Sequence, residues 1–179
     1  MKVILKNGDG LSLEEGARCS DAAKAINESL ARNAVAAKVN GALCDLSHEL
    51  KEGDKLELLT LKDHEGLEVY RHTCAHVLAQ AVKTIFPTCK LAIGPVIENG
   101  FYYDFDFNTP ITQEDFEKIE AEMQKIIKAN TPIERFELSR KEAVELMSGY
   151  NEKYKVELIN DLPDDAAISF YKQGSFTDL

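Results

Sequence analysis

The chain begins with short apolar runs that are separated by turn residues. The apolar runs lie at residues 2–5 and 11–13, and the stretch between them contains Asn7-Gly8-Asp9-Gly10. This pattern predicts a β-hairpin with a tight turn. A hairpin is favoured over a phosphate-binding loop, because no helix opens after the glycines and no lysine follows at the required spacing.

A helix and further strands complete this first region. Apolar residues recur at helical spacing over residues 21–32, with Ser20 as the expected N-cap. Strand-like runs return at residues 35–39 and 55–61. Strands around one helix in so short a segment predict a β-grasp-like α+β domain over residues 1–61.

A charged, polar stretch at residues 61–66 suits a domain boundary, so we expect a second domain over residues 62–179. This domain opens with a helix over residues 67–86. Its apolar positions recur every three or four residues and predict one buried stripe: Leu67, Tyr70, Cys74, Leu78, Ala81 and Ile85. The stripe leaves His72 and His76 on another face of the helix.

The rest of the second domain predicts helices on an antiparallel sheet. Aromatic segments at residues 91–96 and 101–107 flank Glu98-Asn99-Gly100, which indicates a hairpin. Capping boxes and strand-like runs predict the elements that follow: helices after Thr112, after Ser139 and near Glu152, and strands at residues 133–138 and 168–171. The fold class predicted for the chain is therefore α+β.

The charge of the chain bears on its partners. Lys and Arg number 21 against 31 Asp and Glu, which gives a formal net charge of −10. Residues 1–61 hold 8 basic and 10 acidic residues, and residues 62–179 hold 13 basic and 21 acidic residues. An acidic chain opposes the attraction that supplies most non-specific affinity for phosphate backbones. Nucleic acid is therefore expected to be held mainly by residues outside this chain.

Composition also indicates in which cellular compartment the protein is expected. Apolar residues make up 44% of the chain and charged residues 29%, as in a globular protein. No apolar run approaches the roughly 20 residues of a bilayer span, and the N-terminus turns polar before a signal sequence can form. The 4 cysteines lack a CxxC pair, which disfavours a disulfide framework. We therefore expect a cytoplasmic protein with no membrane partner.

The most specific local motif is His72-Thr73-Cys74-Ala75-His76. Histidines four positions apart share a helix face and can hold a water molecule, a metal ion or a substrate. The same spacing also occurs on solvated helix faces without a ligand. Thr73 stands where the HExxH metalloprotease motif has glutamate. A zinc site would need further ligands, and His48, His64 and Cys74 are poorly placed to supply them.

Tyr102 to Phe107 form an aromatic strand interleaved with carboxylates. Strand alternation places Tyr103 with two phenylalanines on one face, opposite Tyr102 and the carboxylates. Core packing explains this pattern, and stacking on a base or ribose is the functional alternative. By position alone, Lys155 and Asp178 are an ordinary surface lysine and a strand-end carboxylate.

Four segments together carry a resemblance to one family. They are residues 1–61, residues 71–81 (RHTCAHVLAQA), residues 93–104 (IGPVIENGFYYD) and residues 174–179 (GSFTDL). They resemble the N-terminal region of the bacterial-type threonyl-tRNA synthetase family, and the resemblance covers the whole chain. It implies a TGS domain at residues 1–61 and a C-terminally truncated editing domain at residues 62–179.

In that family the editing domain hydrolyses serine from mischarged tRNA(Thr). Serine lacks one methyl group of threonine, which is worth only about 1–3 kcal/mol in a binding pocket. Binding selectivity alone is therefore inadequate, and a hydrolytic second sieve is required. The resemblance thus implies an enzyme fragment of a threonine–tRNA ligase that carries an aminoacyl-ester hydrolase site.

The resemblance also implies the residues of that site. His72 and His76 would position and polarise the attacking water and the terminal ribose, and Lys155 would activate water or stabilise charge. Tyr103 and Asp178 would hold the seryl-adenosine end of the substrate. We expect general acid–base and electrostatic catalysis without a covalent intermediate or a metal ion. Threonine would be refused by a clash of its methyl group.

Cofactors and partners follow from the same resemblance. The family's Cys-x-Gly-Pro-His segment would begin just after Leu179, so we expect little editing activity from this chain alone. ATP, Mg and Zn are expected only in the aminoacylation core, which this chain lacks. The expected partner is tRNA(Thr) carrying serine, and a homodimer is expected for the full-length enzyme.

Two other hypotheses stay open. The chain can instead be a non-catalytic RNA- or protein-binding regulatory module, which would bind RNA but gain no hydrolysis on extension past Leu179. A zinc protein is the third hypothesis. It would carry stoichiometric zinc that is lost on replacing His72 or His76 with alanine.

Overall fold

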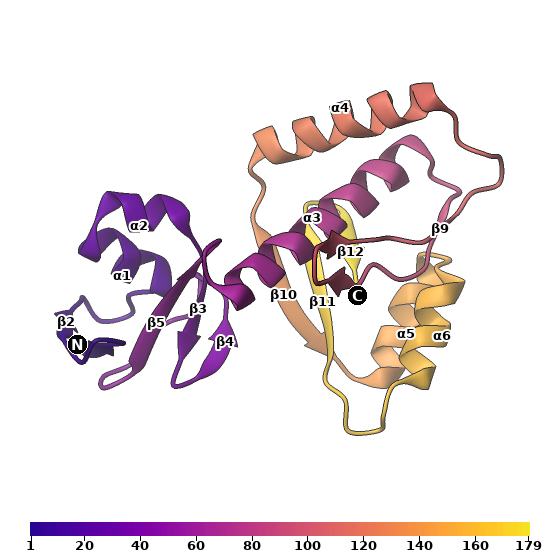
Figure 1. The fold of residues 1–179 in the computed structure, drawn as a ribbon. Helices are drawn as coiled ribbons and strands as arrows, with labels where there is room; N and C mark the ends of the chain where they lie inside the picture. Colours follow the sequence, from indigo (N-terminus) through magenta and orange to yellow (C-terminus); the bar gives the residue numbers. More distant parts are fainter. The chain divides into compact units, whose positions relative to one another are not determined.

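The computed structural model describes all residues from Met1 to Leu179, and its helices and strands form the predicted α+β fold (Figure 1). The chain divides into two units, residues 1–71 and residues 72–179. This division falls within helix α3 (His64–Ile85), beyond the boundary that the sequence predicts at residue 61. Residues 64–71 of α3 therefore belong to the first unit, where Glu65 forms an ion pair with Lys38.

The first unit is built on a five-stranded sheet of order β2-β1-β5-β3-β4. Its strands are β1 (Lys2–Leu5), β2 (Gly10–Ser12), β3 (Ala34–Val39), β4 (Ala42–Cys44) and β5 (Lys55–Thr60). Strands β1 and β5 are parallel, and the other neighbours are antiparallel. The predicted β1–β2 hairpin is confirmed. Side chains from the sheet, from the helix that follows β2 and from the loop before β5 form the core of this unit: Val3, Cys19, Ala22, Ala37, Val39, Leu50 and Leu56.

The single helix predicted over residues 21–32 is two helices, α1 (Cys19–Ile26) and α2 (Glu28–Asn33). Asn27 separates them, because its backbone is extended and its side chain accepts a hydrogen bond from the Leu30 amide at 2.7 Å. Asparagine is a favoured N-cap, so it ends one helix and starts the next. Ser20 is not the N-cap of α1, which begins one residue earlier.

The second unit contains the part of α3 from His72 onward and three further helices, α4 (Gln113–Ala129), α5 (Arg140–Gly149) and α6 (Lys153–Asp161). Its main sheet is antiparallel, of order β10-β11-β12: β10 (Ile133–Leu138), β11 (Ile168–Gln173) and β12 (Phe176–Asp178). The capping boxes at Thr112 and Ser139 are confirmed. None of the helices has both the length and the apolar character needed to span a bilayer.

The aromatic hairpin consists of two short strand pairs. They are β6 (Lys90–Leu91) with β9 (Phe105–Asp106), and β7 (Val96–Ile97) with β8 (Gly100–Phe101). Between the pairs, backbone hydrogen bonds join Ala92 to Asp104 at 3.0 Å and Asp104 to Ile93 at 2.8 Å. The hairpin predicted around residue 99 is therefore present, with an irregular central part.

Two apolar clusters stabilise the second unit. One joins α3, α4 and the aromatic hairpin: Val77, Ala81, Val82, Cys89, Ile119 and Ile126. The other joins α5 and α6 to the sheet: Ala143, Met147, Ile159, Ile168 and Phe170. The stripe predicted on α3 is partly wrong, because Tyr70 is 47% exposed whereas Ala75 and Ala79 are buried. These two alanines neighbour the histidines on the helix, so this side of α3 is covered around His76, whereas His72 stays exposed.

Candidate active site

Asp178 is the centre of a buried polar cluster in the second unit, and only 1% of the residue is exposed. Its Oδ2 accepts hydrogen bonds from the Tyr103 hydroxyl at 2.6 Å and from His76 Nδ1 at 3.2 Å. Its Oδ1 accepts from Lys155 Nζ at 2.8 Å and from the Leu179 amide at 2.9 Å. Both oxygens are thus saturated, which is the condition for keeping a carboxylate charged inside a protein.

The side chains of this cluster come from four different parts of the fold. Helix α3 carries His76, the irregular central part of the aromatic hairpin carries Tyr103, the first turn of α6 carries Lys155, and β12 carries Asp178. Register with β11 sets the position of β12, since Asp178 lies opposite Tyr171. The Tyr171 ring lies 5.4 Å from the ring of His76 and 5.7 Å from that of His72, measured between centroids.

His72 and His76 contact each other directly, with 3.0 Å between their Nε2 atoms. The Asp178 carboxylate favours a proton on Nδ1 of His76. In neutral His76, Nε2 is then an acceptor, and we assign the shared proton to Nε2 of His72. This assignment leaves Nδ1 of His72 with a free lone pair. Because His72 is the most exposed member of the cluster, that lone pair is the one nearest solvent.

Burial and charge set the protonation states of the cluster. Partial burial, together with the charge of His76, lowers the pKa of His72 from 6.5 to about 4. Burial by itself would raise the pKa of Asp178, but the hydrogen bond from His76 and the charge of Lys155 hold it well below its usual range. Burial, with the negative charge of Asp178, raises the pKa of Tyr103. At neutral pH, Asp178 is therefore ionised, while His72 and Tyr103 are neutral.

Tyr103 is fixed by its packing as well as by its hydrogen bond. Its ring stacks on Phe105 with 4.7 Å between centroids, and Lys155 Nζ lies 5.3 Å from the centre of the ring. The backbone of Gly94 packs against the ring, since a Cβ atom at this position would lie 2.2 Å from Tyr103 Cδ2. Only glycine allows this close approach.

Similarity to known proteins agrees with this architecture. A family model described as "TGS domain" matches residues 1–60. The whole chain is 56% identical to threonine–tRNA ligase of Clostridioides difficile (strain 630), 52% to that of Clostridium tetani and 54% to that of Desulforamulus reducens. The chain matches the N-terminal region of threonine–tRNA ligases. It spans 28% of the length of these relatives.

All five residues that the threonyl-tRNA synthetase resemblance implied lie in this cluster: His72, His76, Tyr103, Lys155 and Asp178. Tyr171 and Gly94 also shape the cluster, and sequence reasoning missed both. Tyr171 lies in a strand that the sequence predicted, but no local pattern assigned a role to its side chain. Gly94 belongs to the segment that resembles these ligases, but its role depends on how the hairpin folds the Tyr103 ring back onto the Gly94 backbone.

The cluster does not form a metal-binding geometry. No group of three or more His, Cys, Asp or Glu side chains is placed to hold a metal ion. His72 and His76 use their Nε2 atoms for each other, and His76 turns Nδ1 toward Asp178. The arrangement is instead a chain of hydrogen bonds that ends at a solvent-facing imidazole.

Proposed function

We propose that the cluster around Asp178 is a hydrolytic editing site, which releases serine from seryl-tRNA(Thr) as part of a cytoplasmic threonine–tRNA ligase. The observation that carries the proposal is the chain of hydrogen bonds from Asp178 through His76 to His72. A buried carboxylate that orients an imidazole is the arrangement used to move a proton to and from a reacting oxygen. The similarity to threonine–tRNA ligases supports tRNA(Thr) as the carrier.

The histidine pair can accept the proton of the attacking water and donate it to the leaving group. Water bound at Nδ1 of His72 attacks the ester carbonyl carbon and gives its proton to the pair. The ester C–O bond then breaks, and the proton passes to the departing ribose oxygen. Serine and tRNA are the products, and the pair returns to its starting protonation. Asp178 stabilises the intermediate imidazolium without taking up the proton, because its own pKa is low.

Lys155 and Tyr103 support the reaction in different ways. Lys155 neutralises Asp178, and the donors on Nζ that do not contact Asp178 can stabilise negative charge developing on the ester oxygen. Tyr103 stays protonated and donates to Asp178, so its ring can form a wall for the seryl-adenosine end. Threonine is refused by a clash of its methyl group in a site fitted to serine.

The test measures serine release from seryl-tRNA(Thr), with threonyl-tRNA(Thr) as the control substrate. Two proteins are compared, namely residues 1–179 and a chimera that continues after Leu179 with the Clostridioides difficile sequence. We expect serine-selective release by the chimera and much less by residues 1–179. Absence of release by both would contradict the proposal, and tRNA binding without release would favour the non-catalytic module.

Replacing Asp178 with asparagine tests the role of the carboxylate. The change removes the charge that orients His76, so we expect the rate of serine release by the chimera to fall by about 100-fold or more. The matched control is Asp104→Asn, which alters an exposed carboxylate on the aromatic hairpin. Equal rates for the two variants would show that Asp178 has no part in hydrolysis.

A further inference from the structure

A second ion pair, which is largely buried, joins two of the helices that build the candidate site. Lys83 of α3 pairs with Glu152 at the start of α6, and the side chains are 23% and 5% exposed. Lys83 Nζ also donates to the Cys89 carbonyl at 2.6 Å. The second oxygen of Glu152 accepts from the Leu91 amide at 2.8 Å. The pair therefore holds α3, β6 and the start of α6 together.

This pair lies one step from the Asp178 cluster on both helices. On α3, Lys83 follows His76 by seven residues, so the two share a face. On α6, the Lys155 amide donates to the Glu152 carbonyl at 3.1 Å, which places both residues in one turn. That turn carries two buried charges of opposite sign, and each is paired with another element. Neither Lys83 nor Glu152 forms a hydrogen bond or ion pair with Asp178 or the histidines.

We propose that Lys83 and Glu152 are positioning residues that keep the Lys155 ammonium on Asp178. Without the charge of Lys83, Glu152 would be an uncompensated buried carboxylate, which is costly. Glu152 would then leave its position, and the turn that carries Lys155 would loosen. The consequence for hydrolysis rests on the proposed function, but the effect on Lys155 can be measured without substrate.

The first measurement is the exchange of the Lys155 ammonium protons with solvent, followed by 15N NMR on residues 1–179. Glu152→Gln is the mild variant, because the amide can still accept from Leu91, and Lys83→Met removes the other partner. We expect each to speed this exchange by about tenfold or more while amide protection in β10 and β11 stays unchanged. Faster exchange of ammonium and strand amides together would indicate general loosening and overturn the proposal, as would unchanged ammonium exchange.

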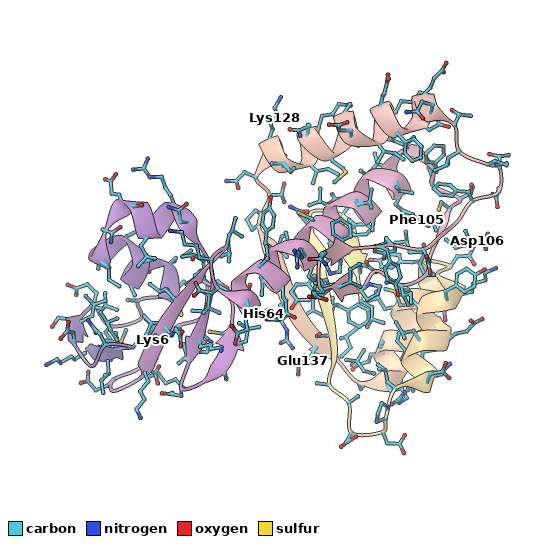
Figure 2. All side chains as sticks on the ribbon, in the orientation of Figure 1. Lys6, His64, Phe105, Asp106, Lys128 and Glu137 are labelled. Atoms are coloured by element: carbon cyan, nitrogen blue, oxygen red, sulfur yellow. The ribbon has the colours of Figure 1, made fainter.

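The matched control is Lys153→Met. Lys153 lies in the same turn of α6, but its ion pair with Asp106 is exposed, with side-chain exposures of 55% and 45%. Asp106 is labelled on β9 in Figure 2, beside the helix that carries this turn. We expect this variant to leave the Lys155 exchange rate within about twofold of the parent. A change as large as that of Glu152→Gln would show that any charge on this turn matters, and would overturn a specific role for the buried pair.

Kinetics of the chimera provide the second measurement. Glu152→Gln should lower kcat for serine release by about tenfold with little change in KM. In a Lys155→Met background the same change should cost less than about twofold, because the group being positioned is gone. Equal losses in both backgrounds would overturn the proposal. If the parent chimera releases no serine, the proposed function fails, while the exchange measurement still decides the positioning role.

Discussion

At the scale of single residues, the candidate site depends on burying one carboxylate among donors that come from distant parts of the chain. Asp178 receives hydrogen bonds from His76 and Tyr103 and an ion pair from Lys155. Because these donors stabilise the charged form, the cluster couples the protonation of its members to folding. Its histidines and its packing each lead to a prediction.

Stability should depend on the protonation of His72. Its pKa is lowered from 6.5 to about 4 in the folded chain, so below pH 6.5 the unfolded chain binds a proton that the folded chain does not. The free energy of unfolding should therefore decrease as the pH falls from 6.5 toward 4. Urea unfolding at several pH values should show a smaller decrease for His72→Gln than for the parent chain. Identical slopes in this pH range would contradict the lowered pKa.

Gly94 should be essential for the position of Tyr103. In Gly94→Ala the new Cβ atom meets the Tyr103 ring, and we expect a loss of about 1–3 kcal/mol in the free energy of unfolding. Gly149→Ala is the control, because a Cβ atom there meets no neighbour. Denaturant unfolding compares the two variants, and the prediction is wrong if Gly94→Ala is as stable as Gly149→Ala.

At the scale of elements, local sequence patterns predicted most helices and strands, and capping residues predicted where two of the helices start. The boxes at Thr112 and Ser139 start α4 and α5 as predicted, because a cap involves neighbours within four residues. The same physics acts at Asn27, which divides the expected single helix. The helical spacing continued through that position, so the apolar pattern hid the break.

Asn27→Ala should weaken α2 by removing its side-chain cap. We expect the free energy of unfolding of the first unit to fall by about 1 kcal/mol. Amide hydrogen exchange in β1, β3 and β5 measures this change. Asn27→Asp keeps an oxygen acceptor at this position and should retain the stability. Equal exchange rates in the two variants would show that the hydrogen bond to Leu30 contributes nothing.

At the scale of the whole molecule, each unit contains its own buried apolar clusters. Leu56 belongs to the core of the first unit, and Phe170 belongs to a core of the second. Leu56→Ala should destabilise the first unit by about 2–5 kcal/mol and speed amide exchange there. Phe170→Leu should speed exchange in the second unit. Faster exchange throughout the chain in both variants would contradict separate cores.

The sequence by itself determined the element types, the α+β class and the resemblance to threonyl-tRNA synthetases. Those features follow from residue periodicity, turn chemistry and motifs that are read along the chain. It did not show that α3 is covered around Ala75 and Ala79, that Tyr70 is exposed or that α1 ends before Asn27. Packing against elements that are far away in the sequence decides both the burial of α3 side chains and the exposure of Tyr70.

Only the tertiary structure decided the burial and the pairing of Lys155 and Asp178. By position they are a surface lysine and a strand-end carboxylate, yet both are buried and paired with each other. Burial of a charge is stable only when its partners converge in space, and here they come from α3, the aromatic hairpin, α6 and β12. No local pattern encodes that convergence, because it depends on where the fold brings separate elements together.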